Sequence, residues 1–314
     1  MRSSLQWLVL TLFAVAWSVA AAASDLQAPV FHFALLGDAP YTDEEEGRFL
    51  ELLKTLNADQ SLTFVVHAGD FKDGHSPCTD ELFARRHAQF QSVEHPLIIV
   101  FGDNEWVDCR REEAGQYDPA ERLNKLREIF TSGSESLGKR TLRLSRQSDD
   151  ARYRKFRENV RWTYGDVLFV TLNVPGSYNN SAQKRESEER NAANVAWLKE
   201  SFRLATDSGA RGVLVVIHAN PKFQSSPKRN PYRVLLATLE REVLACGKPV
   251  VLVHGDTHRF RIDKPLRDSK TGQPIDNLTR VETFGSPDVR WIKGTVDPRD
   301  PNVFSFEPMQ QESR

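Results

Sequence analysis

Short apolar runs alternate with longer amphipathic segments along most of the chain. Five runs are too short for helices and are almost entirely apolar, at 31–36, 62–66, 97–101, 213–217 and 250–253. Nearly continuous apolar character, rather than alternation, is typical of strands covered on both faces. Helical patterns occupy 42–56, 79–93, 118–130, 188–206 and 231–246. Strands that alternate with helices form βαβ units, so we expect an α/β domain with a largely parallel sheet.

Three segments depart from this alternation. Strand-like runs separated by turn residues fill 162–174 and 280–306, which predicts a second sheet packed on the first. Residues 110–161 are charged and rich in arginine, as expected of an insertion on the outside of the domain. No stretch has the composition of a linker, so we predict a single domain over 28–308 and a disordered tail at 309–314.

The first two dozen residues predict export. Arg2 is the only charge before Asp25, residues 5–20 are almost continuously apolar, and small residues follow at 21–24. This is the pattern of a signal peptide, residues 1–23, cleaved near Ala23. An uncleaved anchor is the alternative, because 5–23 is nearly long enough to span a bilayer. We expect an exported protein, either periplasmic or secreted.

The chain has three cysteines, and their expected redox state depends on whether the protein is exported. Cys78 and Cys109 lie in polar loops shortly after Gly-Asp pairs, whereas Cys246 ends an apolar helical run. Exported proteins meet oxidising conditions. We therefore predict a disulfide between Cys78 and Cys109 and a free, buried Cys246. Free thiols, or a metal ligand among them, are the alternative.

Charge excludes some classes of partner. The chain carries 42 basic and 43 acidic side chains, without repeats or low-complexity tracts. This balance gives no basis for a nucleic-acid or membrane surface. We expect a monomer that acts on a small molecule.

Four predicted strands end in the same dipeptide. Gly-Asp occurs at 37–38, 69–70, 102–103 and 255–256, and a fifth strand ends at His218. In an open α/β sheet, ligands bind outside the carboxyl ends of the strands. Carboxylates gathered there would repel one another unless a cation neutralised them, which predicts a divalent metal site. Aspartates that only cap turns are the alternative.

The order of these motifs resembles the calcineurin-like metallophosphoesterases. That family has GD-x-H, GD-x-x-D, GNH-(D/E), a lone His and GH-x-H, where this chain has GDAP, GDFKD, GDNE, His218 and GDTH. The match covers about residues 31–262. The resemblance implies a four-layer α/β/β/α sandwich with two mixed β-sheets flanked by helices. It also implies two metal ions and attack of a metal-bound hydroxide on a phosphate mono- or diester.

The resemblance also implies a role for each motif residue. The implied ligands of the first metal are Asp38 and His258, with Asp70 bridging both metals. Those of the second metal are Asp103, His218 and Asp256. Asp73 and Glu105 would orient the ligands and their neighbours.

Several motif positions depart from the family pattern. Pro40 stands in place of a histidine ligand, Asp103 in place of asparagine, and Asp256 in place of histidine. Four carboxylates and two imidazoles form a hard ligand set, which favours Mn, Fe or Mg over Zn as the two divalent or trivalent ions.

Asn104 replaces the histidine that, in the family, contacts the phosphate and helps the leaving group depart. An acid catalyst contributes about 10²–10⁴-fold to a rate. Asn104 can still donate a hydrogen bond to a phosphoryl oxygen. His75 is the candidate replacement acid, and an exposed loop histidine is the alternative.

The sequence therefore predicts a phosphate-ester hydrolase, with two other functions left open. Pro40 and Asn104 also fit a degenerate relative that binds metal or phosphate with little turnover. The third possibility is a structural exported protein whose aspartates only cap turns. The segments at 110–161 and 173–180 are expected to shape the pocket, and the second is predicted to lie over the crevice.

Overall fold

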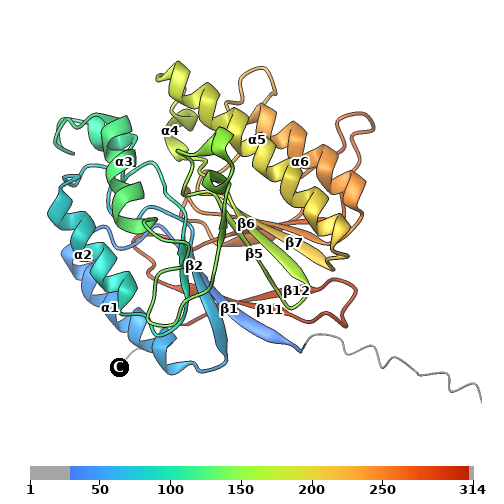
Figure 1. Ribbon diagram of the computed structural model, residues 1–314, viewed down its shortest axis with the longest axis horizontal. Coiled ribbons are helices and arrows are strands. Elements are labelled where there is room, and N and C mark those ends of the chain that lie inside the picture. Colours follow the sequence, from blue (N-terminus) through green and yellow to red (C-terminus); the bar gives the residue numbers. More distant parts are fainter. Residues whose placement is uncertain (1–28, 311–314) are drawn as a thin grey trace, which may run out of the picture.

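Two β-sheets pack face to face between two layers of helices (Figure 1). The computed structural model describes residues 29–310. The predicted signal peptide, 1–23, and residues 311–314 of the predicted tail lie outside the described residues. The arrangement confirms the expected α/β/β/α sandwich with two mixed sheets.

The first sheet has the strand order β12-β11-β1-β2-β3. Its strands β1, β2 and β3 are parallel, and β11 and β12 continue the sheet antiparallel beyond β1. The strands are β1 (Phe31–Leu36), β2 (Leu62–His67), β3 (Leu97–Ile99), β11 (Trp291–Val296) and β12 (Phe304–Met309).

The second sheet has the strand order β4-β5-β6-β7-β8-β10-β9. The four strands β6, β7, β8 and β10 are parallel, their neighbours β5 and β9 are antiparallel to them, and the edge strand β4 pairs antiparallel with β5. The strands are β4 (Ser145–Arg146), β5 (Val160–Tyr164), β6 (Val167–Thr171), β7 (Gly212–Val216), β8 (Val250–His254), β9 (Arg261–Asp263) and β10 (Leu278–Glu282).

Helices cover the outer face of each sheet. On the first sheet lie α1 (Asp43–Ala58), α2 (Asp80–Gln91) and α3 (Pro119–Phe130), and on the second lie α5 (Lys184–Asp207) and α6 (Arg233–Cys246) (Figure 1). The short α4 (Gly176–Asn179) precedes α5. Three 3₁₀ turns are η1 (Asp108–Arg110), η2 (Gln147–Asp149) and η3 (Ala151–Tyr153).

Every apolar run predicted as a strand is a strand, and all five predicted helices are present within a few residues of their expected ends. The division into sheets differs from the prediction. β1, β2 and β3 belong to one sheet, whereas β7 and β8 belong to the other. The segment 280–306 is shared, because β10 pairs with β8 and β11 pairs with β1. Local patterns predict strands but not their partners, which are chosen by burial between distant segments.

The residues at 110–161 are only partly external. Leu123, Leu126 and Phe130 of α3 are buried in the core beneath the first helical layer. Some of its charged residues are buried too, among them Arg127 and Glu158, which form an ion pair. This segment therefore contributes to the fold as well as to the surface.

The two sheets share an aromatic core. Because side chains alternate along a strand, Phe31, Phe33 and Leu35 of β1 face the other sheet, whereas Ala34 and Leu36 face the helices. The Phe33 ring stacks on Phe64 with centroids 5.3 Å apart, and Phe169 of the second sheet meets Phe33 edge-on at 5.6 Å. This packing fixes the two sheets relative to each other.

The start of α1 is held by reciprocal hydrogen bonds. The Thr42 side chain accepts from the Glu45 backbone N–H at 3.2 Å, as expected for an N-cap. The Glu45 carboxylate accepts from the backbone N–H of Tyr41 at 2.8 Å, one residue before the position of a standard capping box. The cap therefore fixes Tyr41 as well as the helix.

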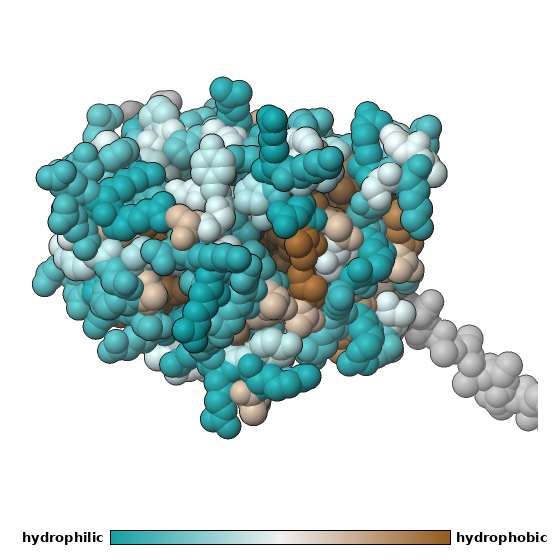
Figure 2. Space-filling model, turned by 90° about the horizontal axis from the view of Figure 1, so that it is seen from above, coloured by the Kyte–Doolittle hydropathy of each residue, from teal (hydrophilic) through white to brown (hydrophobic). Residues whose placement is uncertain are grey.

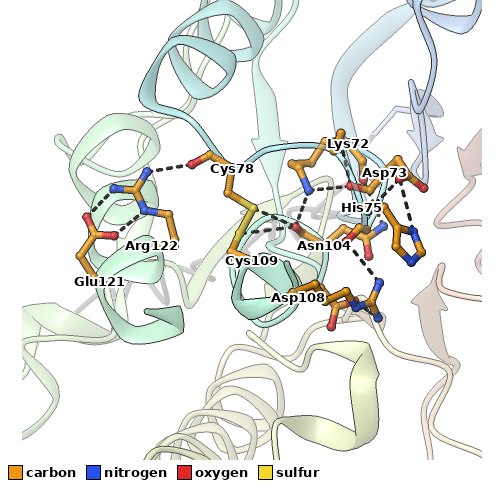
Figure 3. Close-up of a disulfide and its surroundings, with 12 residues drawn as sticks. Lys72, Asp73, His75, Cys78, Asn104, Asp108, Cys109, Glu121 and Arg122 are labelled. Carbon is orange, nitrogen blue, oxygen red and sulfur yellow. Dashed lines mark hydrogen bonds and ion pairs between the residues drawn. A yellow bond between two sulfur atoms is a disulfide. The ribbon is translucent and has the colours of Figure 1, made fainter. Parts of the chain in front are cut away.

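Cys78 and Cys109 form the predicted disulfide, with their Cα atoms 5.7 Å apart (Figure 3). Cys246 is free, as predicted, but it is half-buried rather than buried, because it lies at the last turn of α6. The bond joins the loop that follows β2 to the loop that follows β3. It thus ties together two of the segments that carry Gly-Asp motifs.

The surface seen from above is mostly hydrophilic, with apolar side chains gathered in a limited area (Figure 2). Within residues 29–310, no helix is both long and apolar enough to cross a membrane.

Candidate metal centre

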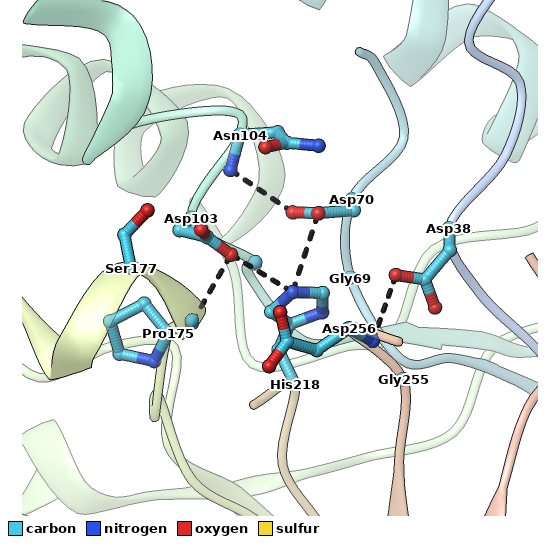
Figure 4. A network of polar contacts seen from close by, with 12 residues as sticks. Asp38, Gly69, Asp70, Asp103, Asn104, Pro175, Ser177, His218, Gly255 and Asp256 are labelled. Atoms are coloured by element: carbon cyan, nitrogen blue, oxygen red, sulfur yellow. Dashed lines mark hydrogen bonds and ion pairs between the residues drawn. The ribbon is translucent and has the colours of Figure 1, made fainter. Parts of the chain in front are cut away.

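Four aspartates and one histidine converge at the carboxyl ends of strands from both sheets (Figure 4). Ligand atoms of Asp38, Asp70 and His218 lie within 4.8 Å of one another, and so do those of Asp103, His218 and Asp256. The two groups share His218. The structure therefore brings these five residues together at the strand ends.

Left-handed backbone turns direct these side chains inward. Asp38, Asp70 and Asp256 have φ values of +52°, +55° and +77°. Such angles are uncommon for residues other than glycine, and they concentrate at functional sites. The strain is one sign that these aspartates do more than end strands.

The glycines of the motifs allow close approach between neighbouring motifs. A Cβ atom on Gly102 would lie 1.9 Å from Oδ1 of Asp70, and one on Gly255 would lie 2.1 Å from Oδ2 of Asp38. Any side chain at either position would displace a carboxylate. Glycine is thus required for the geometry of the cluster as well as for the turn.

His218 is oriented to bind a cation. Its Nδ1 donates to the carbonyl of Ala68 at 2.9 Å, which leaves Nε2 without a proton in the neutral ring. Nε2 is buried without a well-oriented hydrogen-bond partner, although it lies 3.3 Å from Asp70 and 3.0 Å from Asp103. A buried imidazole nitrogen that makes no hydrogen bond and lies between two carboxylates fits the position of a metal ligand.

His258 is oriented in the same way but lies farther out. Its Nδ1 donates to the carbonyl of Ser286 at 2.7 Å, and its Nε2 lies 3.6 Å from Oδ1 of Asp38. Among the described residues, His258 belongs to neither of the two ligand groups. Its assignment to the first metal remains a prediction.

The electrostatics show a deficit of positive charge. Burial raises the pKa of Asp38 well above its usual range, opposed by His218 and reinforced by Asp70. Burial also raises the pKa of Asp256 to about 6. Burial lowers the pKa of His218, but Asp70 and Asp103 outweigh it, so that pKa lies well above its usual value. A cation would relieve the repulsion that a proton on His218 relieves only in part.

Tyr41 was missed by the sequence reasoning. Its hydroxyl donates to Oδ2 of Asp70 at 3.1 Å, accepts from the Asn104 amide at 3.1 Å, and lies 3.2 Å from Nε2 of His258. The phenol oxygen thus lies between Asp70 and His258. The signal available in the sequence was its place directly after Pro40, where the family motif has lost its histidine.

Asn104 and Glu105 fix the position of the cluster through hydrogen bonds. The Asn104 backbone N–H donates to Oδ1 of Asp70 at 3.0 Å, and its side-chain amide also donates to the carbonyl of Lys72 at 3.1 Å. Oε1 of Glu105 accepts from the backbone N–H groups of Asp70 at 3.2 Å and Gly102 at 2.6 Å. Both residues therefore position Asp70.

Residues from several surrounding loops contact the carbonyl of Asn104 (Figure 3). The ammonium of Lys72 donates to it at 2.8 Å, and the sulfurs of Cys78 and Cys109 lie 3.6 and 3.7 Å away. Burial lowers the pKa of Lys72 to about 8. The disulfide thus lies directly behind the motif that carries Asp103.

Asp73 and His75 lie at the edge of the site. The Asp73 carboxylate accepts from the His75 backbone N–H at 2.8 Å and lies 3.6 Å from its ring, and that ring is largely exposed. A Cβ on Gly74 would lie 2.7 Å from Oδ1 of Asn104, so the loop adjoins the cluster. The roles predicted for these two residues stay predictions.

The loop at 173–180 reaches the cluster, as predicted. The backbone N–H of Gly176 donates to Oδ1 of Asp103 at 3.1 Å. The next four residues, Ser177 to Asn180, have φ values of +42°, +54°, +58° and +50°. Each such residue costs roughly 1–2 kcal/mol when it is not glycine. The buried Arg190 compensates by donating to the side-chain and backbone oxygens of Asn179 at 2.7 and 3.0 Å.

Solved structures share this fold at low sequence identity. The Plasmodium protein GAP50, described as the anchor in the inner membrane complex, aligns at 12% identity and a TM-score of 0.50, over 91% of this chain and 90% of its own. PhoD aligns at 13% identity and a TM-score of 0.52, over 87% of this chain and 65% of its own. The purple acid phosphatase PPD1 from yellow lupin seeds aligns at 12% identity and a TM-score of 0.52, over 89% of this chain and 53% of its own.

No curated protein matches the chain in sequence. The family model described as calcineurin-like phosphoesterase matches residues 21–260. That range contains all five motifs and every aspartate and histidine of the cluster. The chain therefore belongs to the calcineurin-like phosphoesterase family.

Proposed function

We propose that this chain is an exported hydrolase of phosphate mono- or diesters that holds two metal ions at the strand ends. The observation that carries the proposal is His218, whose buried Nε2 makes no hydrogen bond but lies between the carboxylates of Asp70 and Asp103. Family membership supports phosphoester hydrolysis in general. The disulfide fits the oxidising compartment that an exported protein would enter.

Asp103, His218 and Asp256 form one proposed metal position, which coincides with one of the two observed ligand groups. Asp38, Asp70 and His258 form the other, with Asp70 shared between the metals. Tyr41 extends the ligand set of this first metal, because its oxygen lies beside Asp70 and His258, and it follows Pro40, which replaces a histidine. Metal–ligand bonds of about 2.0–2.2 Å place adjacent ligands roughly 3 Å apart, close to the two distances that Tyr41 makes.

The donor set is rich in oxygen and fits hard ions. With Tyr41 included, carboxylate and phenol oxygens outnumber imidazole nitrogens, which favours Mn, Fe or Mg over Zn. Bound metal would supply positive charge to the phosphoryl oxygens and would lower the pKa of an attacking water.

The residues around the cluster supply positioning. Glu105 fixes the backbone of Asp70 and Gly102, so the bridging carboxylate is held before any ligand binds. The amide of Asn104 points to the hydroxyl of Tyr41 and is close enough to the cluster to donate to a phosphoryl oxygen instead. His75, on the loop beside Asn104, is the proposed proton donor to the leaving group.

The test compares two aspartates that are both changed to asparagine. Asp70→Asn removes the bridging charge, and we expect kcat/KM for 4-nitrophenyl phosphate to fall by more than about 100-fold, beyond the loss of a residue that only orients a ligand. Asp118→Asn is the matched control, because Asp118 caps α3 and asparagine caps equally well. Metal content, measured on both variants, should fall only in the first. Wild-type activity in folded Asp70→Asn would remove Asp70 from its bridging role.

A second candidate is a relative that binds metal or phosphate with little turnover. The substitutions at Pro40 and Asn104 favour it, and the structurally similar GAP50 is described as an anchor. Purified wild-type protein that contains metal but hydrolyses neither mono- nor diesters with Mn, Fe or Zn would support this candidate. Hydrolysis that chelation abolishes and metal restores would exclude it.

A further inference from the structure

Two loops donate backbone hydrogen bonds to two different proposed ligands of the second metal, Asp103 and Asp256. One donates from the backbone of Gly176 to Asp103 at 3.1 Å, and the other donates from the backbone of Asn220 to Oδ2 of Asp256 at 2.9 Å. A Cβ on Gly176 would also lie 2.8 Å from Oδ1 of Asp256, so the first loop contacts both carboxylates. The loops therefore border the same side of the cluster.

The tips of the two loops meet. Tyr178 lies two residues beyond Gly176, and Lys222 lies two residues beyond Asn220. The Lys222 ammonium is 4.2 Å from the centroid of the Tyr178 ring. Tyr178 is nevertheless 67% exposed, more than any other large hydrophobic side chain of residues 29–310. The pair thus presents an aromatic ring and a positive charge to solvent beside the metal centre.

The exposed ring is held in place. Its backbone has a φ of +54°, within the left-handed turn of Ser177 to Asn180. Arg190, which is almost fully buried, binds Asn179 through its side chain and backbone oxygens, and the Asn179 amide donates to the carbonyl of Pro231 at 3.3 Å. Holding an exposed tyrosine in a strained turn gives nothing to the core, which points to a role toward a ligand.

We propose that Tyr178 and Lys222 form the substrate-binding edge of the site and select phosphate esters whose leaving group is a planar aromatic ring. This rests on the proposed function. The leaving group stacks on the exposed part of the Tyr178 ring, and Lys222 attracts the phosphoryl group toward the metals. Aromatic stacking and a cation beside the ring favour such groups over alkyl chains of similar size.

The kinetic test uses variants that suit the backbone. Tyr178→Asn removes the ring but tolerates a positive φ, and Tyr178→Phe keeps the ring. Tyr178→Asn should lower kcat/KM for phenyl phosphate about tenfold, mainly through KM, relative to glycerol 2-phosphate. Tyr178→Phe should keep the wild-type preference. Equal losses for both esters in Tyr178→Asn, or no loss, would overturn the proposal.

A binding test separates this inference from the proposed function. Metal-loaded wild-type protein should bind phenylphosphonate more tightly than methylphosphonate, and Tyr178→Asn should remove the difference. Lys222→Gln should weaken both by about tenfold, whereas Lys54→Gln on α1 should weaken neither. Equal affinity for the two phosphonates in wild-type protein would refute the aromatic preference. Tyr178-dependent discrimination without hydrolysis of any ester would uphold it and refute the hydrolase.

Discussion

Glu158 and Asp38 are both buried carboxylates, yet their surroundings differ. The Arg127 guanidinium donates to both oxygens of Glu158, at 2.8 and 2.6 Å, and the Asn173 amide adds a third hydrogen bond at 3.0 Å. Burial raises the pKa of Glu158, but Arg127 outweighs it, so the pKa lies below its usual value. For Asp38, the effect of burial prevails, and the pKa lies well above its usual value.

The difference shows how to recognise a site that uses an external cation. The counter-ion of Glu158 is Arg127 of the same chain, so the negative charge of Glu158 is neutralised within the folded protein. The ion pairs of Asp38, Asp70 and Asp103 are with two histidines, which cannot balance them fully. A buried charge left without an internal partner is expensive unless a ligand provides one.

The largest expected effect comes from leaving Glu158 unpaired. Arg127→Met should lower the free energy of unfolding by about 3–5 kcal/mol, because it leaves a buried charge uncompensated. Bound metal per chain should not change. Denaturant unfolding and elemental analysis measure the two quantities. Arg152→Met, which breaks an exposed pair with Asp150, should leave the free energy of unfolding nearly unchanged, because solvent screens that pair. Similar losses of unfolding free energy in both variants would contradict the expected difference between the buried and the exposed ion pair.

Metal should stabilise the region around Asp38. Adding Mn²⁺ to chelator-treated protein at 100 times its dissociation constant should raise the free energy of unfolding by about 2.7 kcal/mol. Arg127→Met should gain as much, because its defect lies elsewhere. A thermal shift that is the same with Mn²⁺ as with an equal concentration of K⁺ would contradict a specific site.

Tyr41→Phe should weaken metal binding without unfolding the protein. Loss of the phenol oxygen should raise the dissociation constant of the metal proposed at Asp38, Asp70 and His258 about tenfold, equivalent to about 1.4 kcal/mol. Tyr164→Phe, in the half-exposed strand β5, is the control. Metal titration followed by elemental analysis reads this directly. Unchanged affinity would show that the hydroxyl only braces Asp70.

The smallest effect is a gain in stability. Because burial raises the pKa of Asp38, its ionised form is penalised in the folded state. Without metal at pH 7, Asp38→Asn should therefore raise the free energy of unfolding slightly. Its amide oxygen can still accept from the Asp256 backbone. The gain should shrink as pH falls through the raised pKa, where wild-type Asp38 is protonated. A loss as large as that of Arg127→Met would show that Asp38 is structural.

Much of the fold could be predicted, because its signals are local. Apolar runs at 31–36 and 250–253 match β1 and β8, and Thr42 caps α1 as its sequence indicates. The partition of strands between the sheets was not predictable. β10 and β11 come from one stretch of chain but join different sheets, and which edge each strand joins depends on burial against segments far away.

The site divides in the same way. Its aspartates and His218 could be located because each ends a strand, and parallel strands end at a common edge. Tyr41 could not be, because its hydroxyl reaches Asp70 only through the turn between β1 and α1. Tyr178 and Lys222 could not be paired either, because they lie on separate loops.

The sequence by itself determined the strands, the helices, the disulfide partners and the motif residues that gather at the strand ends. These follow from local periodicity, from turn chemistry and from the order of motifs along the chain. Tertiary structure alone decided which carboxylates lack an internal counter-ion. It also placed a phenol beside Asp70 and an exposed aromatic ring beside the cluster. Such features depend on distances between side chains from distant segments, which no local pattern encodes.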